Sequence, residues 1–453
     1  MKKIDNFFDL IRTQNEMWNN IPHEHYTRYS VKRGLRNPDG TGVLAGLTAI
    51  GEVHGYIIDE GAVKPIDGRL RYRGIDIEDL AQGAQSNGGF GFEETIFLLI
   101  FGLLPSKKEL EEFKETLSSM MKLPAGFTED VILNAPSNNI MNMLSRCILA
   151  MYAYDEDPDN LSLPNLLRQS LLLIAQFPIM AAHAYAAKAH YFDKKSLILH
   201  TPDPSLSFAE NFLYMLRPDN KFTKMEAEIL DLALMLHAEH GGGNNSAFAV
   251  RVVTSSDTDT YSTIAAAIGS LKGPKHGGAN DEMLNMIREI KANVKNWEDK
   301  DEIFAYLTKI LRKEAGDGKG LIYGMGHPVY TISDPRTAML KEKAKLLSET
   351  FGFEKEFTLY DNIETLAPEA FHAFKGKNHP ICPNVDFYSG FVYEMLGIPK
   401  ALYTPIFAMS RITGWCAHRI EEVTTGGRII RPAYKSIVNK TNYIPISERK
   451  KVL

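Results

Sequence analysis

The chain of 453 residues is too long for one ordinary hydrophobic core, so its length predicts two or three domains. Hydrophobic residues make up 44% and charged residues 24%, as in globular proteins, and the net charge of −5 argues against nucleic-acid binding. The three cysteines, Cys147, Cys382 and Cys416, form no CxxC pair, which excludes a cysteine-rich zinc module and suits a reducing compartment.

Two segments bear on secretion and membrane insertion: the N-terminal residues and the most apolar run of the chain. Residues 1–20 contain two lysines but no apolar stretch, so we expect no secretory signal and a cytoplasmic location. The most apolar long run, residues 171–187, carries Gln176, Pro178 and His183. It predicts a pair of buried helices broken at the proline, and not a membrane span.

In chain order, the first expected element is a small β-hairpin within residues 47–74, where alternation and glycines coincide. A buried helix is expected at 93–103 and a surface helix at 107–122. Further helical periods predict helices at 225–240, 261–271, 281–290, 302–313, 335–350, 387–397 and 404–422. The predicted fold is therefore all-α with a minor β element.

The stretch LKGPKHGGAN at 271–280 holds one histidine in a rigid bend between two predicted helices. Gly273 and Pro274 should end the first helix, and Asn280 should cap the second. His276 would then lie near a helix N-terminus, where a charged imidazolium is disfavoured, so we expect a neutral imidazole. The alternative is a structural corner in which the histidine only caps a carbonyl.

Other polar residues lie beside glycines, prolines or helix starts or, in the case of Arg411, among apolar neighbours on the predicted helix 404–422. They are His240, His327, Arg336, Asp386, Arg411 and Arg431. Three arginines can hold a dianionic small molecule through carboxylate contacts. Three histidines and one aspartate can supply acids, a hydrogen-bond donor and a base. Each residue alone also fits a structural role. Arg336, for example, follows Asp334 and Pro335, which are plausible as the N-cap and the first residue of a helix.

Two other classes of function use the same residues. His237 and His240, three apart on a helix, could bind a metal together with His276 and Asp386. The sequence lacks an HExxH motif and these residues are far apart, so we expect no metal site. A non-catalytic helical interaction protein is the third alternative, but it would not need arginines beside glycine-flanked histidines.

Several blocks in order resemble the signature segments of citrate synthase. They are RLRYRGIDIEDLA (69–81), FEETIFLLIFGLLP (from 92), HAEHGGGNNSAF (237–248), GSLKGPKHGGAN (269–280), GMGHPVYTISDPR (324–336), PNVDFYSG (383–390), FAMSRITGW (407–415) and IRP (430–432). The resemblance implies an all-α fold and a homodimer. It also implies a large domain at 1–277 and 392–453 and a smaller mobile domain at 278–391.

The resemblance implies an acyltransferase that converts acetyl-CoA and oxaloacetate into citrate and CoA, the entry step of the tricarboxylic acid cycle. His276 would donate a hydrogen bond to the thioester oxygen, and Asp386 would remove a proton from the acetyl methyl group. His327 would polarise the keto oxygen of oxaloacetate. Its remaining ligands would be His240, Arg336, Arg411 and, from the partner subunit, Arg431.

For CoA, the resemblance implies an adenine-recognition loop formed by Leu321, Ile322, Tyr323, Gly324, Met325 and Gly326. Lys375 and Lys377 are candidates for phosphate contacts, with solvated loop lysines as the alternative. No metal or other cofactor is expected, since acetyl-CoA is a substrate. 2-Methylcitrate synthase, which uses propionyl-CoA, stays open because one methylene is worth only about 1–3 kcal/mol.

Overall fold

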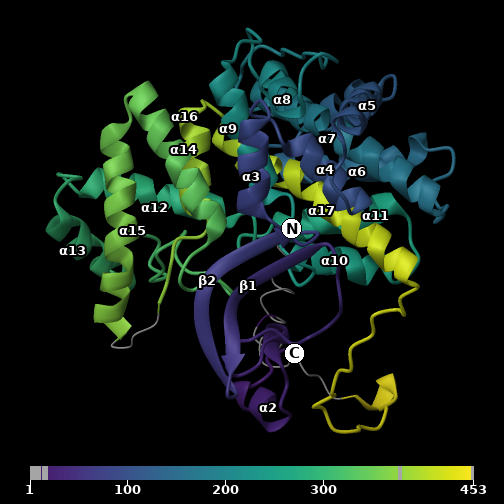
Figure 1. Ribbon diagram of the computed structural model, residues 1–453. Coiled ribbons are helices and arrows are strands. Elements are labelled where there is room, and N and C mark those ends of the chain that lie inside the picture. Colours follow the sequence, from purple (N-terminus) through teal and green to yellow (C-terminus); the bar gives the residue numbers. More distant parts are fainter. Residues whose placement is uncertain (1–11, 13–18, 376–379, 450–453) are drawn as a thin grey trace. The chain divides into compact units, whose positions relative to one another are not determined.

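The structure is a computed structural model that describes residue 12, residues 19–375 and residues 380–449 (Figure 1). The chain divides into two compact units. One contains the described parts of residues 1–44 and 430–453, and the other spans Ala45–Ile429. The predicted domain at 278–391 lies wholly within the second unit, and its mobility relative to the rest stays a prediction.

The unit formed by the chain ends has little regular structure in its described residues. It contains the short helices α2 (His23–Arg28), η1 (Arg33–Leu35) and η5 (Ile446–Glu448). Residues 431–449 are exposed throughout.

The unit Ala45–Ile429 begins with a three-stranded antiparallel sheet of order β1-β2-β3. Its strands are β1 (Gly51–Asp59), β2 (Ala62–Tyr72) and β3 (Ile75–Asp76). Asp59 pairs with Ala62, so the hairpin loop is the two residues Glu60 and Gly61. Both have positive φ, 50° and 81°, as a two-residue turn matched to the twist of its strands requires. The hairpin predicted within 47–74 is therefore confirmed.

Helices follow the sheet, and two of those in the first group are predicted from the periodicity. The first group comprises α3 (Ile77–Ser86), α4 (Phe92–Phe101), α5 (Lys107–Met120), the π-helix η2 (Thr128–Leu133), α6 (Ile140–Met151) and η3 (Tyr152–Tyr154). The predicted buried and surface helices correspond to α4 and α5. Ser106 begins α5 with a capping box to Glu109, and only Phe113 and Leu117 of this helix are buried.

The apolar run at 171–187 differs from its prediction. It belongs to one helix, α7 (Leu163–Tyr191), with Pro178 inside it, so the predicted break at the proline is wrong. Pro178 removes one backbone hydrogen bond, but the helix is buried on both sides of it, and this packing holds the two halves together. By length and composition α7 could cross a membrane, with mean hydropathy 1.4, but 89% of its apolar window is buried inside the protein.

The rest of the unit is helical. Its helices are α8 (Phe208–Leu216), α9 (Lys224–His237), α10 (Asn245–Thr254), α11 (Thr260–Leu271), α12 (Ala279–Asn293), α13 (Lys300–Leu311), α14 (Pro335–Phe351), α15 (Glu354–Lys375), α16 (Val385–Met395), η4 (Lys400–Leu402) and α17 (Tyr403–Thr425). The predicted segments after residue 220 correspond to α9, α11 to α14, α16 and α17. The all-α fold class with a minor sheet is confirmed.

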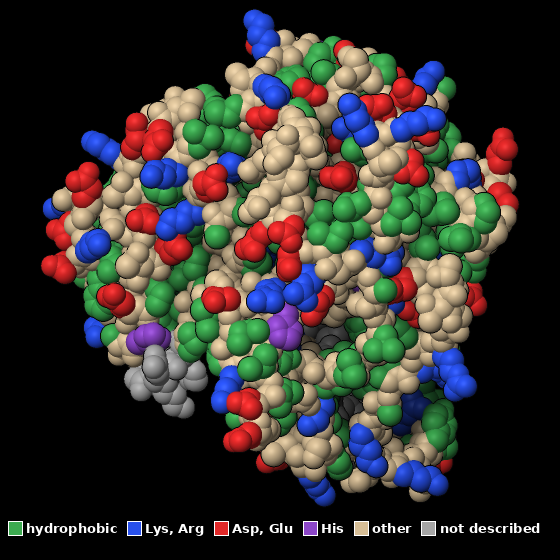
Figure 2. All heavy atoms as spheres, in the orientation of Figure 1, with side chains coloured by type: hydrophobic (Ala, Val, Ile, Leu, Met, Phe, Trp, Pro, Cys, Tyr) green, Lys and Arg blue, Asp and Glu red, His purple; other side chains and the backbone are tan. Residues whose placement is uncertain are grey.

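Helix α17 organises the core. It packs against α4, α7, α9, α10 and α11, and Figure 1 shows it running between them. Every residue from Tyr403 to Ile420 is buried, including Arg411, His418 and Arg419. Charged side chains in such a position need partners or ligands, since an isolated buried charge is costly. The outer surface is different: Figure 2 shows acidic and basic side chains interspersed over the visible face.

Candidate functional site

The structure brings together the predicted site residues that lie between Ala45 and Ile429. The rings of His240 and His327 meet edge to face, with centroids 5.0 Å apart. Phe407 joins two others, since the Cζ atom of Arg411 lies 4.8 Å and the His276 ring 6.1 Å from its centroid. These residues come from four separate segments of the chain, so only tertiary packing assembles them.

A short backbone bridge ties the His327 loop to the helix that carries Asp386. Met325 and Pro383 form an antiparallel bridge, and the amide of Gly326 donates to the carbonyl of Cys382 at 2.8 Å. Asn384 then caps α16 through the amide of Asp386 and donates its side-chain amide to the Gly326 carbonyl at 3.0 Å. Asp386 thus lies in the first turn of its helix, as predicted.

The backbone fixes the tautomer of His327. Its Nδ1 atom accepts from the amides of Val329 and Tyr330, each at 3.1 Å. A ring nitrogen that accepts these bonds carries no proton, so the imidazole is neutral with its proton on Nε2. In this tautomer the only N–H donor of the His327 ring is Nε2–H.

His276 is neutral for a different reason from the one predicted. Burial, and secondarily the charge of Arg411, lowers the pKa of His276 to about 4. Asn280 is not the N-cap: α12 begins after Gly278, and the Asn280 side chain instead donates to Ser389 at 3.0 Å. The prediction of a cap at Asn280 is wrong because the helix begins earlier, which makes Asn280 its second residue, with a helical backbone and a side chain turned to another helix.

The Nε2 atom of His276 lies 3.0 Å from the hydroxyl of Ser246, a residue that sequence reasoning missed. The Ser246 oxygen also accepts from the indole N–H of Trp415 at 3.0 Å, and its hydroxyl can donate to the Oδ1 atom of Asn244 at 2.9 Å as well as to His276. When the single hydroxyl proton is donated to His276, the imidazole proton must be on Nδ1. When that proton is donated to Asn244 instead, the imidazole must donate from Nε2, so the tautomer of His276 depends on which acceptor takes the Ser246 proton.

Asp386 has the properties of a general base. Burial raises its pKa to about 6, against the opposing charge of Arg336 and the hydrogen bond from Asn280 at 3.4 Å. A carboxylate with a pKa near 6 takes up a proton more readily than an exposed aspartate and is still ionised at neutral pH.

The two candidate site arginines within this unit, Arg336 and Arg411, have different partners. Arg336 is held by Asp334, with Nε to Oδ1 at 3.0 Å and Nη2 to Oδ2 at 2.7 Å. Asp334 also caps α14 and Pro335 is its first residue, as predicted. Burial opposes the charge of Arg336, but Asp334 outweighs it and raises the pKa of the guanidinium. Arg336 is therefore a charged group in a fixed position.

Arg411 has donors without acceptors. Its Nε donates to the His237 carbonyl at 2.6 Å, but Nη1 and Nη2 are buried and have no partner within the described residues. The Nε2 atom of His240 is in the same condition. Burial, with Arg336 next, lowers the pKa of His240 well below its ordinary value, so this imidazole is neutral. Unpaired buried donors cost about 1–3 kcal/mol each, which favours an anionic ligand that accepts from them.

Glu239 is a further buried charge that the sequence analysis did not assign. Its Oε1 atom accepts from His418 Nε2 at 2.9 Å, and His418 Nδ1 accepts from Arg251 at 2.7 Å. Burial would raise the pKa of Glu239, but the His418 hydrogen bond and the charge of Arg411 lower it. Glu239 is therefore an anion that balances Arg411 from within the core.

In the predicted CoA loop, part of the backbone already forms hydrogen bonds within the protein. The Gly324 carbonyl and the amide and carbonyl of Gly326 are bonded to residues 382–384. Leu321 is 52% exposed and Ile322 is buried. Lys375 ends α15, and Lys377 lies outside the described residues. The CoA assignments stay predictions.

Arg431 is exposed and belongs to the unit formed by the chain ends. Its predicted place is in the site of a partner subunit, so this assignment also stays a prediction.

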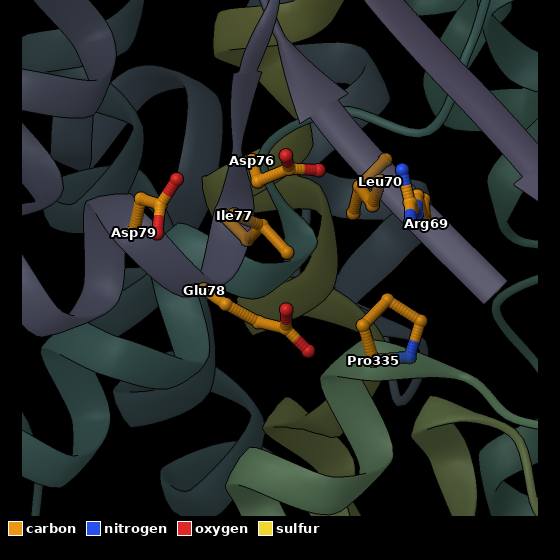
Figure 3. A pocket seen from close by; sticks show the side chains of 7 residues that line it. All are labelled: Arg69, Leu70, Asp76, Ile77, Glu78, Asp79 and Pro335. Carbon is orange, nitrogen blue, oxygen red and sulfur yellow. The ribbon is translucent and has the colours of Figure 1, made fainter. Parts of the chain in front are cut away.

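Two hollows of the described structure are lined mainly by residues of the sheet and of the segments next to it. One, of about 240 Å³, is lined by Arg69, Leu70, Asp76, Ile77, Glu78, Asp79 and Pro335 (Figure 3). Another, of about 440 Å³, lies along Thr48–Val53 and Gly74. The first is bordered by three carboxylates at the start of α3, which would repel a dianion. Among the described residues, no three His, Cys, Asp or Glu side chains are arranged to hold a metal ion.

Known proteins are similar to most of this chain. The family model "Citrate synthase, C-terminal domain" matches residues 39–433. Citrate synthase 2 of Bacillus subtilis is 36% identical over 89% of this chain and 100% of its own length. Citrate synthase of Synechocystis sp. is 35% identical over 84% of this chain and 89% of its own. 2-Methylcitrate synthase 1 of Corynebacterium glutamicum is 32% identical over 92% and 98%.

A solved structure shares the fold. It is the ternary complex of citrate synthase from Thermoplasma acidophilum with carboxymethyl coenzyme A and oxaloacetate. The TM-score is 0.75 at 28% identity, over 92% of this chain and 99% of that one. With the family match spanning most of its length, the chain belongs to the citrate synthase family.

Proposed function

We propose that the protein condenses acetyl-CoA with oxaloacetate and hydrolyses the resulting citryl-CoA to citrate and CoA. The observation that carries the proposal is the set of buried nitrogen atoms that have no hydrogen-bond partner among the described residues, Nη1 and Nη2 of Arg411 and Nε2 of His240, beside His327. These donors match the carboxylates and keto oxygen of oxaloacetate. The ligands in the Thermoplasma acidophilum complex support the same assignment.

Oxaloacetate is bound by Arg411, Arg336 and His240, with Arg431 of a second chain completing the set. Arg336 keeps its ion pair with Asp334, so it supplies charge from a fixed position while Arg411 supplies free N–H groups. His327 donates Nε2–H to the keto oxygen, which makes the keto carbon electrophilic. Neutral imidazoles and fixed guanidinium groups need little rearrangement as charge develops.

Acetyl-CoA is activated by His276 and Asp386. A thioester α-proton is too weakly acidic for a free carboxylate to remove, so the developing enolate oxygen must be stabilised. With the Ser246 hydroxyl donating to Nε2, His276 presents Nδ1–H to that oxygen, and one such donor is worth about 3–4 kcal/mol. Asp386 takes the methyl proton, and positioned proton transfer adds about 10²–10⁴-fold. The enolate carbon then attacks the keto carbon, and His327 protonates the oxygen.

The basic test is direct. Purified protein with acetyl-CoA and oxaloacetate should release CoA thiol and form citrate in equal amounts, with no added metal or other cofactor. Replacing acetyl-CoA by propionyl-CoA should give slower turnover, by about 10–200-fold for one extra methylene in a fitted pocket. Faster turnover with propionyl-CoA would assign 2-methylcitrate synthase instead, a function that relatives of comparable identity carry.

The proposed homodimer shares its sites, with Arg431 acting in the partner's site. Arg431→Ala and Asp386→Ala should each be inactive as homodimers. In a mixed dimer, one site combines an intact Asp386 with an intact Arg431 from the other chain. Random refolding of equal amounts makes about half the dimers mixed, so about one quarter of wild-type activity should return. No recovery, with mixed dimers shown to be present, would place Arg431 in the site of its own chain.

The cellular location that we propose is the cytoplasm. All three cysteines are buried and unpaired, which suits a reducing compartment. Measuring the enzyme activity in separated cell fractions tests this.

A further inference from the structure

Tyr330 is fully buried against three of the predicted site residues. Its ring stacks on His327, with centroids 4.7 Å apart and planes 24° from parallel. The same ring meets His240 edge to face at 5.5 Å, and the Cζ atom of Arg336 lies 5.8 Å from its centroid. A side chain that contacts two histidines and an arginine of one site can control how they face each other.

The β-hairpin holds Tyr330 in this position. The phenol donates to the carbonyl of Arg69 on β2 at 3.2 Å. Next to it, the Gly68 amide donates to the Ser333 hydroxyl at 3.1 Å, and that hydroxyl lies 3.0 Å from Asp67 Oδ1. Strand β2 therefore contacts both Tyr330 and Ser333, two residues of the loop that follows His327.

Two glycines of the hairpin make this contact possible. A Cβ atom at Gly68 would lie 2.1 Å from the Ser333 carbonyl oxygen and 2.7 Å from Cδ1 of Tyr330. A Cβ atom at Gly55, on β1, would lie 2.6 Å from the Val329 carbonyl oxygen. Since backbone oxygens cannot rotate away as side chains do, any larger residue must displace the loop that follows His327.

The loop position matters because the same loop sets the state of His327. The amides that fix the proton on Nε2 are those of Val329 and Tyr330, and the Tyr330 ring covers one face of the imidazole. Displacement of this loop would weaken both hydrogen bonds to Nδ1 of His327 and would allow its imidazole ring to rotate. Displacing a reacting group by about 1 Å can reduce turnover by about 10²-fold.

We propose that Tyr330 is a positioning residue that fixes the ring plane and tautomer of His327, and that β2 at Gly68 and Arg69 clamps it in place. The effect on turnover rests on the proposed function, but the effect on the imidazole of the ligand-free protein does not. The sheet at the start of the unit thus serves the site from which it is distant in sequence.

The experiment compares Tyr330→Leu, Tyr330→Phe and Gly68→Ala with wild type. The matched control is Tyr261→Leu, which removes another fully buried tyrosine, one whose phenol bonds Asp155 at 2.6 Å. Nitrogen-15 chemical shifts of labelled histidine report the His327 tautomer without ligand, with the signal assigned by His327→Gln. The carbonyl stretching frequency of bound, carbon-13-labelled oxaloacetate reports how strongly His327 polarises it.

Tyr330→Leu and Gly68→Ala should each lower kcat by about 10–100-fold. They should also move the His327 signals towards a mixture of tautomers and reduce the polarisation of bound oxaloacetate. Tyr330→Phe keeps the stacked ring and should stay within about threefold of wild type. Tyr261→Leu should leave the His327 signals unchanged.

Wild-type His327 signals in Tyr330→Leu, or in Gly68→Ala if the first variant does not fold, would overturn the proposal. An equal change in Tyr261→Leu would do the same, because it would indicate general destabilisation. A wild-type protein that makes no citrate would reject the proposed function, while the histidine signals of the ligand-free variants would still decide this inference.

Discussion

The loops that carry His276 and His327 reach the same chemical state by different means. Both imidazoles are neutral and each has one nitrogen committed to a hydrogen bond. For His276 the partner is a side chain, the Ser246 hydroxyl, and burial lowers the pKa to about 4. For His327 the partners are two amides of its own turn. The tautomer of His276 can therefore be changed by substituting one residue that is distant in sequence. The tautomer of His327 changes only when its loop moves.

The largest effect should come from removing each imidazole. His276→Ala and His327→Ala should both lower kcat by about 10²–10³-fold, since each loses a donor to a developing oxyanion. They should differ in binding: His276→Ala keeps the affinity for oxaloacetate, and His327→Ala weakens it. Steady-state kinetics with calorimetric titration of oxaloacetate measures both, and His190→Ala, an exposed histidine on α7, is the control. Identical binding defects would show that the two loops do not serve separate substrates.

A smaller effect isolates the side-chain partner. Ser246→Ala should lower kcat about tenfold, because the tautomer preference of His276 then loses a hydrogen bond worth about 0.5–1.5 kcal/mol. The His327 signals in nitrogen-15 spectra should not change. Ser256→Ala, an exposed serine beyond the end of α10, is the matched control. Turnover at the wild-type level in Ser246→Ala would exclude Ser246 as the tautomer selector.

The pH dependence of kcat/KM should reflect the titration of Asp386 and not that of His276. Asp386 must be ionised to act, and burial raises its pKa to about 6, so kcat/KM for acetyl-CoA should halve near pH 6 and fall about tenfold per unit below it. His276 must be neutral, and with a pKa of about 4 it stays so over this range. An acid limb displaced by more than a unit, or an activity unchanged down to pH 5, contradicts the assignment of Asp386.

No change is expected on chelation. In both loops an imidazole nitrogen is used in a hydrogen bond, and the remaining one is assigned to an organic substrate. Activity after dialysis against a chelator should equal that of untreated protein. A loss that one particular divalent ion restores would instead support the metal-binding alternative with His237 and His240.

The sequence by itself determined the helical class, the hairpin and the identity of the cluster. These depend on local periods, on turn residues such as Glu60 and Gly61, and on motif order. It also placed Asp334 as the cap and Pro335 as the first residue of α14, because capping is decided within one turn of chain.

Only the tertiary structure decided the partners of these residues. Pro178 is accommodated because packing on both sides of it outweighs one lost backbone bond, which no local pattern reveals. Asn280, which was expected to cap α12, instead lies within this helix and donates to Ser389, over a hundred residues away. The roles of Ser246 and Tyr330 depend on contacts with α17 and β2, and the low pKa of His276 depends on burial. Burial and long-range hydrogen bonds are properties of the packed chain, so they become defined only when its distant segments meet.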